Sequence, residues 1–168
     1  LFDYQFDINL FNELNSQQIP MIYQSIYEYF SKNKFDKVVT ISDNSSISTA
    51  TIAAINEKYI VRNEDTFTSN LKILYINSSP NIDTNDNLIS FENKVVSSLM
   101  GLLDKTLTNH KLLLKPDQII YLGIRKDIAS DNELMLLDQL GIKYFTMERI
   151  NKLGIDIILT HILKEFND

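Results

Sequence analysis

The stretch QIIYLGIRKDIASDNELMLLDQLGIKYF, from Gln118 to Phe145, predicts a strand, a helix and a second strand in immediate succession. The apolar run before Gly123 is typical of a buried strand. Asp131–Leu140 has helical spacing, with Gly141 expected as its C-terminal stop. Lys143–Phe145 predicts the next short strand. Because parallel strands need a helical crossover of this kind, the stretch indicates a βαβ unit.

The same alternation continues on both sides of this unit. Helices are expected at Gln17–Ser31, Ser46–Tyr59, about Phe91–Thr108 and Ile155–Phe166, strands at Asp36–Ser42 and Leu71–Ile76, and a polar linker at 61–70. We therefore expect one α/β domain over 1–168, with three layers, α-β-α, around a mostly parallel sheet. The aromatic-rich residues 1–16 form a candidate N-terminal arm, which either packs across the domain or docks onto a partner.

Composition removes several classes of function. The net charge of −6 argues against nucleic-acid binding, and there is no cysteine for a disulfide, a thiolate nucleophile or a thiolate metal site. Four glycines do not build a phosphate-binding loop, and no run of about 18 apolar residues predicts a membrane span. His110 and His161 fall on expected helix surfaces or ends. Ser45 and Ser79 lack the glycine-flanked elbow of a hydrolase nucleophile.

In parallel α/β sheets, ligands bind outside the carboxyl ends of the strands. Those ends are expected at Ser42–Asn44, Asn77–Asn81 and Ile124–Asp127. The second exit, NSSPN, carries no charged side chain. Its polar residues suit turns and caps, because amide and hydroxyl groups readily bond to nearby backbone.

Several short strings resemble the arginase (ureohydrolase) family, in the family's order and at nearly its spacing. Tyr121–Arg125, Leu140–Met147 and Leu153–Ile155 match its Y-I-G-L-R, L-G-I-K-Y-F-S-M and L-G-I. The resemblance runs roughly from Asp36 to Phe166. It implies an arginase-like fold, truncated relative to the full family fold. Arginases hold two Mn²⁺ ions at their strand ends, where a bridging hydroxide attacks a guanidinium carbon.

The resemblance places neutral residues at the family's metal ligands. Asn44 stands at the histidine of G-G-D-H-S, after Asp43. In the family's D-A-H-x-D motif, Asn77 replaces the first aspartate, Ser79 the histidine and Asn81 the last aspartate. Amides and hydroxyls do not balance two divalent cations, so we expect manganese binding to be lost and no cofactor to be bound.

Further charged residues lie near the same strand exits. Asp83 and Thr84 follow the second exit, where the family binds the amino-acid end of its substrate. With Asp43 they form a candidate residual pocket, although Asp83 also suits a turn. At the third exit, Arg125 matches a family arginine that forms ion pairs within the fold, and we expect the same here.

These observations favour a catalytically inactive arginase-like protein that acts as a structural or regulatory subunit of a larger assembly. Protein partners or a homo-oligomer are expected, with no nucleic acid and no membrane span. An intracellular location, in the cytoplasm or a mitochondrion, is favoured. Two alternatives stay open. One is an active enzyme, either completed by residues outside this chain or using the old pocket without metal. The other is a sensor of an amino acid or polyamine in the vestigial pocket.

Overall fold

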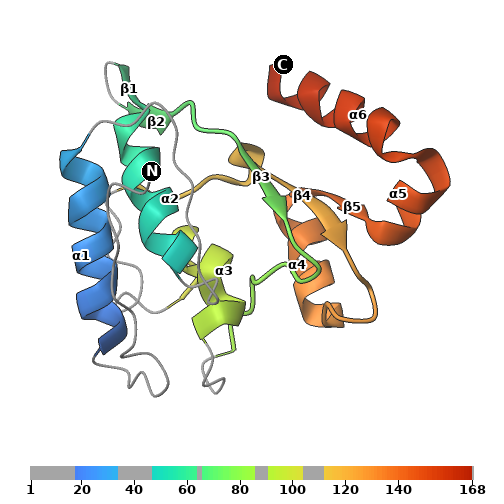
Figure 1. Ribbon diagram of the computed structural model, residues 1–168, viewed down its shortest axis with the longest axis horizontal. Helices are drawn as coiled ribbons and strands as arrows, with labels where there is room; N and C mark the ends of the chain where they lie inside the picture. The colour runs from blue at the N-terminus through green and yellow to red at the C-terminus, as the bar shows by residue number, and fades with distance from the viewer. Residues whose placement is uncertain (1–17, 34–46, 64–65, 86–90, 104–111, 168) are drawn as a thin grey trace, which may run out of the picture.

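A parallel three-stranded sheet organises the chain. Figure 1 shows the computed structural model, which describes residues 18–33, 47–63, 66–85, 91–103 and 112–167. The strands β3 (Ile73–Ile76), β4 (Ile119–Ile124) and β5 (Lys143–Thr146) lie in that order, and both neighbouring pairs are parallel. This arrangement confirms the expected βαβ unit and the α/β class.

Helices cover both faces of this sheet and make three layers. Side chains alternate along a strand, so Tyr121 and Ile120 of β4 enter separate clusters. On the Tyr121 face lie α3 (Val95–Leu99) and α4 (Asp131–Leu140), and on the Ile120 face lies α6 (Ile155–Asn167). The fully buried side chains of these helices include Val95, Val96, Leu137 and Ile158. Each contributes about 1.5–3 kcal/mol by leaving water.

Two further helices pack side by side beside the first cluster. These are α1 (Gln18–Lys32) and α2 (Ile47–Lys58), as expected from their spacing. Ile26 of α1 and Ala53 of α2 are buried, and Ala53 belongs to the cluster on the Tyr121 face. The helix α2 therefore connects the α1 layer to the sheet.

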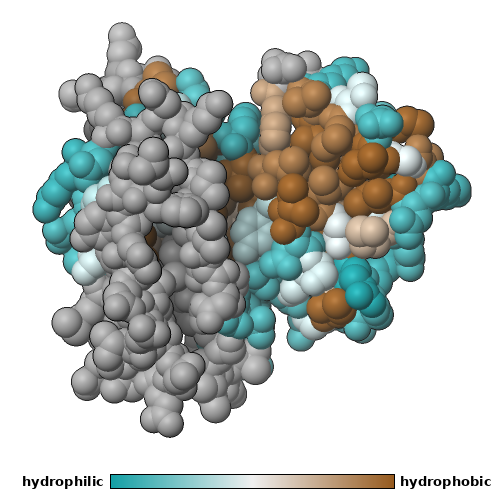
Figure 2. Space-filling view, viewed as in Figure 1, coloured by the Kyte–Doolittle hydropathy of each residue, from teal (hydrophilic) through white to brown (hydrophobic). Residues whose placement is uncertain are grey.

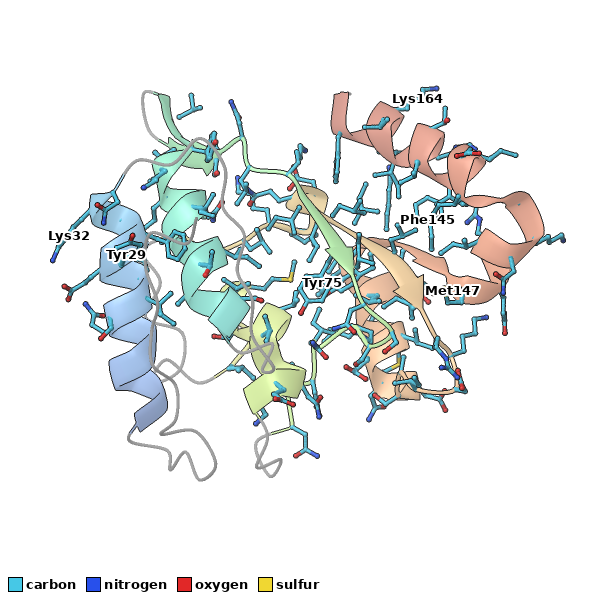
Figure 3. The ribbon with its side chains drawn as sticks, viewed as in Figure 1. Tyr29, Lys32, Tyr75, Phe145, Met147 and Lys164 are labelled. Carbon is cyan, nitrogen blue, oxygen red and sulfur yellow. The ribbon has the colours of Figure 1, made fainter. Side chains whose placement is uncertain are left out.

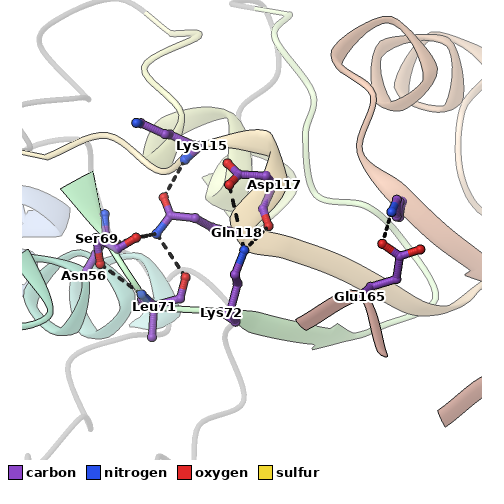
Figure 4. A network of polar contacts seen from close by, with 9 residues as sticks. Asn56, Ser69, Leu71, Lys72, Lys115, Asp117, Gln118 and Glu165 are labelled. Atoms are coloured by element: carbon purple, nitrogen blue, oxygen red, sulfur yellow. Dashed lines mark hydrogen bonds and ion pairs between the residues drawn. The ribbon is translucent and has the colours of Figure 1, made fainter. Parts of the chain in front are cut away.

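The start of β4 is fixed by the buried side chain of Gln118, which ends a 3-10 turn at Pro116–Gln118 (Figure 4). Its amide donates to the Asn56 side chain at 3.0 Å and to the Leu71 carbonyl at 3.1 Å. Its oxygen accepts from the Lys115 backbone at 2.8 Å. The Gln118 side chain thus links α2 to the residues just before β3 and just before β4.

Residues 61–70, expected as a polar linker, contain a hairpin instead. The strands β1 (Ile60–Asn63) and β2 (Thr66–Ser69) pair antiparallel, with Ile60 opposite Ser69. The linker prediction was wrong because it weighed polarity alone. β-branched residues such as Val61 and Thr68 favour extended backbone regardless of their polarity.

Two helices also differ from the prediction. A helix is expected over about Phe91–Thr108, of which 104–108 lie outside the described residues. The described part is a 3-10 turn at Phe91–Lys94 followed by α3, which ends at Leu99. Gly101 follows in a left-handed conformation, with φ of +71°, and this backbone interrupts a helix. An unpredicted helix, α5 (Met147–Leu153), begins where the Thr146 hydroxyl accepts from the Arg149 amide at 3.2 Å. The expected strand Asp36–Ser42 and the arm 1–16 lie outside the described residues.

Apolar side chains remain exposed near β3 and α6. Figure 2 shows a broad hydrophobic surface on this side of the molecule. Ile76 at the end of β3 is 72% exposed, and Leu163 on α6 is 61% exposed. Among the described ranges, β3 pairs only with β4. No helix within those ranges is long and apolar enough to cross a membrane.

Candidate functional site

The exits of β3 and β4 lie side by side, as the carboxyl ends of neighbouring parallel strands must. Ile76 of β3 is in register with Leu122 of β4. The Asn77 amide donates to the Leu122 carbonyl at 3.2 Å, and the Arg125 amide donates to the Ser78 carbonyl at 2.9 Å. These bonds tie the two exit loops together. The candidate site is therefore the loop 77–85, which follows β3.

The side chains of Asn77 and Ser79 stabilise the turn by which this loop begins. The Asn77 side-chain oxygen accepts from the Ser78 amide at 2.8 Å. The Ser79 hydroxyl accepts from the Asn81 amide at 3.4 Å. Asn81 itself has a φ of +51° and is 5% exposed. Asparagine adopts this left-handed backbone more readily than most residues, so it suits the point where the chain reverses.

The hydroxyl of Tyr75 meets the side chain of Asn81. The Asn81 side-chain amide donates to it at 3.1 Å. Figure 3 labels Tyr75 on β3. Burial raises the pKa of Tyr75, and the hydrogen bond from Asn81 partly opposes that rise. The hydroxyl therefore stays protonated at neutral pH.

Two residues outside the loop hold its middle against the core. The Tyr121 hydroxyl, which is buried, donates to the Pro80 carbonyl at 2.9 Å. The Glu133 carboxylate on α4 accepts from the Ile82 amide at 3.4 Å and from the Ser130 amide at 3.0 Å. Burial raises the pKa of Tyr121 well above its usual value, and Tyr75 and Glu133 add to the rise.

Sequence reasoning missed all three of these contributors. Apolar spacing predicts Tyr75 and Tyr121 only as members of buried strands. Glu133 had a usable signal, because Ser130 and Glu133 have the S-x-x-E spacing of a capping box, and the structure confirms that box. Nothing in the sequence indicated that the same carboxylate also reaches the loop after β3.

Of the candidate residual pocket, Asp83 and Thr84 fall within the described residues. The Asp83 carboxylate accepts from the Asn85 amide at 2.8 Å, and the Asp83 carbonyl accepts from the Ser97 hydroxyl at 2.7 Å. Asp83 is thus a turn residue in contact with α3, and Thr84 is exposed. Asp43 and Asn44 lie outside the described residues.

A pocket of about 330 Å³ lies between α2 and β3, close to the exit. Its lining residues, all uncharged, are Ser48, Thr51, Ile52, Ile73, Leu74, Tyr75, Ile76 and Asn77. Asp83 and Thr84 are not among them. The pocket has the chemistry of a neutral, partly apolar surface, and its described lining offers no carboxylate to an ammonium or guanidinium group.

The third exit carries the expected ion pair. The Arg125 guanidinium contacts the Asp127 carboxylate at 2.5 Å, and this partner raises the pKa of Arg125 and lowers that of Asp127. Both side chains are exposed, so the pair is local to the loop and contributes little to stability. His161 is an exposed residue of α6, as expected, and His110 lies outside the described ranges.

The donor set at the β3 exit does not suit a divalent cation. Asn77, Ser79 and Asn81 are neutral, and the first two already use a side-chain oxygen to accept a backbone hydrogen. The Asn81 amide nitrogen, a donor, is directed at Tyr75. Manganese prefers carboxylate and imidazole ligands. Within the described ranges, no three His, Asp or Glu side chains gather in a cluster that could hold a metal.

Comparisons with known proteins point to one family. The model of the arginase family matches residues 3–168. The arginase of Saccharomyces cerevisiae is 26% identical over 161 residues, which make up 90% of this chain and 44% of that protein. The chain therefore spans about half the length of the relatives it matches.

Solved structures show the same fold. An arginase from Entamoeba histolytica, in complex with L-ornithine, has a TM-score of 0.76 at 20% identity, over 90% of this chain and 51% of that one. A cold-adapted arginase from Glaciozyma antarctica has a TM-score of 0.71 at 22% identity, over 90% and 52%. A formimidoylglutamase from Bacillus subtilis has a TM-score of 0.68 at 17% identity, over 93% and 44%.

Proposed function

This chain belongs to the arginase family, and from that premise we propose that it is a member without manganese and without ureohydrolase activity. It serves instead as a structural or regulatory subunit of a larger assembly. The proposal rests on the bonds that the polar side chains at the β3 exit make. The residues that the sequence aligns with metal ligands are neutral, and their polar atoms bond to the loop itself.

Charge is the physical reason why Asn77, Ser79 and Asn81 disfavour a bound metal ion. In the resembled family, two divalent ions require several anionic oxygens and imidazoles. An amide or a hydroxyl is a weak, uncharged ligand, and moving it onto a metal breaks a hydrogen bond in the turn. No hydrolytic step is therefore assigned to this chain. Its residues at the exit shape the loop through their own hydrogen bonds.

The assembly role is supported by the apolar surface beside the site. Ile76, Ile157 and Leu163 are all at least half exposed, on β3 and α6. Contiguous exposed apolar surface is uncommon on monomers and marks contact surfaces. Partners are either other proteins or further copies of this chain.

A sensor is the second candidate, favoured by the pocket between α2 and β3. A thermal-shift screen with arginine, ornithine and polyamines tests it, because a ligand that binds only the folded state raises Tm. Stabilisation by one of them at millimolar concentration or below would support the sensor. The uncharged lining favours no shift with these cationic ligands.

Metal content and urea release test the main proposal. The protein is purified after growth with added manganese, its metal is measured by elemental analysis, and urea release is assayed on arginine and agmatine. The arginase of Saccharomyces cerevisiae, treated identically, is the positive control. We expect no stoichiometric manganese and no turnover above background. Two ions per chain, or measurable turnover, would support the alternative of an active enzyme.

A further inference from the structure

The buried side chain of Asn81, at the β3 exit, bonds to a hydroxyl on the strand that the loop has just left. We propose that the Tyr75 hydroxyl replaces a metal ion as the group that organises the loop 77–85. This inference rests on the proposed loss of manganese and adds what took its place. It assigns Tyr75 a positioning role that its place in an apolar strand does not suggest.

The hydroxyl is reached by a residue aligned with a carboxylate ligand. Asn81 returns to the strand because its left-handed backbone reverses the chain, and its side-chain amide meets the hydroxyl at 3.1 Å. The Asn77 side-chain oxygen supports this return by accepting from the Ser78 amide at 2.8 Å, at the start of the turn.

The position of the hydroxyl is itself fixed by packing. The Tyr75 ring meets the Tyr121 ring edge-on, with centroids 5.2 Å apart and an interplanar angle of 63°. Tyr121 is buried, and its own hydroxyl is bonded to the Pro80 carbonyl. The aromatic pair therefore holds both the centre of the loop and its proline turn in one rigid unit.

This arrangement excludes a cation by its polarity. A metal ion needs oxygen atoms directed at it, whereas here the Asn81 amide directs its N–H group at the Tyr75 oxygen. A tyrosine hydroxyl accepts such bonds and supplies no charge at neutral pH. The hydrogen bonds that Asn77, Ser79 and Asn81 make through their side chains are consequently all neutral.

Four backbone amides report on the state of this loop. The amides of Ser78, Asn81 and Ile82 donate to side chains of Asn77, Ser79 and Glu133, and the Asp83 amide donates to the Asn93 carbonyl at 2.9 Å. All four acceptors are groups of the chain itself. If Tyr75 organises the loop, these amides depend on its hydroxyl and are indifferent to metal.

Hydrogen–deuterium exchange of these amides tests the proposal. The wild-type chain is compared in EDTA and in millimolar MnCl₂, together with Tyr75→Phe and Asn81→Gly, which tolerates the positive φ. Tyr144→Phe on β5 is the matched control. We expect identical wild-type rates with and without Mn²⁺. Both site variants should exchange the loop amides at least about tenfold faster, and the control should behave as wild type.

The outcomes separate this inference from the proposed function. Wild-type rates at the loop amides in both Tyr75→Phe and Asn81→Gly would overturn the inference while leaving the absence of metal intact. Slower exchange of the wild-type loop in MnCl₂ would overturn the proposed function, and the inference with it. If Tyr75→Phe does not fold, Asn81→Gly alone decides, because it removes one bond to the hydroxyl and leaves the aromatic packing unchanged.

Discussion

The Asn81 side-chain amide donates a hydrogen bond of 3.1 Å to the hydroxyl of Tyr75, six positions earlier in the chain. Asn81 is buried and has a φ of +51°, so the bond closes a tight return of the backbone onto the strand it has just left. The return fixes the carbonyl of Asn81 as well, which accepts from the Val96 amide of α3 at 2.9 Å. The strand exit is therefore part of the packing between β3 and α3.

Substitutions of Asn81 separate the contribution of the side chain from that of the backbone. Glycine adopts the positive φ freely, so Asn81→Gly should lose mainly the hydrogen bond, about 1 kcal/mol. Alanine adds left-handed strain of about 1–2 kcal/mol, so Asn81→Ala should be the less stable variant. Urea denaturation measures both free energies of unfolding. Equal stabilities for the two variants would contradict the left-handed backbone at this position.

Tyr121→Phe should destabilise the fold by about 1–3 kcal/mol, because it leaves the buried Pro80 carbonyl without its donor. The phenyl ring keeps the contact with Tyr75, so packing changes little. Tyr59→Phe is the control, since Tyr59 is 55% exposed and its replacement should stay within about 0.5 kcal/mol of wild type. A Tyr121→Phe variant as stable as the control would show that the hydroxyl makes no net contribution.

Alkaline pH should weaken the fold through its tyrosines. Burial raises the pKa values of Tyr75 and Tyr121, and burial with Glu57 beside it raises that of Tyr27 to about 12. In the unfolded chain these groups ionise near pH 10. Above that pH the folded state binds more protons than the unfolded state, so stability falls as pH rises.

Urea denaturation between pH 8 and pH 12 measures this dependence. Each tyrosine that stays protonated in the folded state contributes a slope of about −1.4 kcal/mol per pH unit above pH 10. Tyr75→Phe cannot ionise and should show a shallower slope than wild type. A wild-type free energy of unfolding that does not change between pH 8 and pH 12 would contradict the burial of the Tyr75 and Tyr121 hydroxyls.

Ile76→Lys should disrupt assembly without unfolding the chain. Ile76 is 72% exposed, and a lysine there places a charge within the exposed apolar surface. Light scattering coupled to gel filtration should show a smaller particle than wild type at the same Tm. Met135→Lys on α4, where Met135 is 53% exposed, is the matched control and should keep the wild-type mass. The assembly role would be contradicted if the wild-type protein is monomeric both when purified alone and when isolated from its native source.

Much of the fold follows from periodicity. The helices α1, α2, α4 and α6 and the strands β3, β4 and β5 lie where apolar spacing predicts them. Gly141 ends α4 in a left-handed conformation, with φ of +69°. The early end of α3 was not predicted, because its apolar pattern continues past Gly101. That end depends on a backbone angle, which hydrophobic spacing does not encode.

The site was predictable only in part. The turn-forming roles of Asn77 and Ser79 follow from the tendency of side-chain amides and hydroxyls after a strand to bond to nearby backbone. The roles of Tyr121 and Glu133 depend on contacts 41 and 51 residues away along the chain, which no local pattern reveals. The role of the Tyr75 hydroxyl was not predictable for another reason. A tyrosine within an apolar strand contributes its ring to the core whether or not its hydroxyl has a partner.

We propose that hydrogen bonds, and no metal, hold the exit of β3. Titration of the full chain with Mn²⁺, followed by the electron paramagnetic resonance signal of the free ion, tests it most directly. We predict a free-ion signal equal to that of buffer at every addition, before and after EDTA treatment of the protein. A signal suppressed until about two Mn²⁺ per chain have been added would contradict the account.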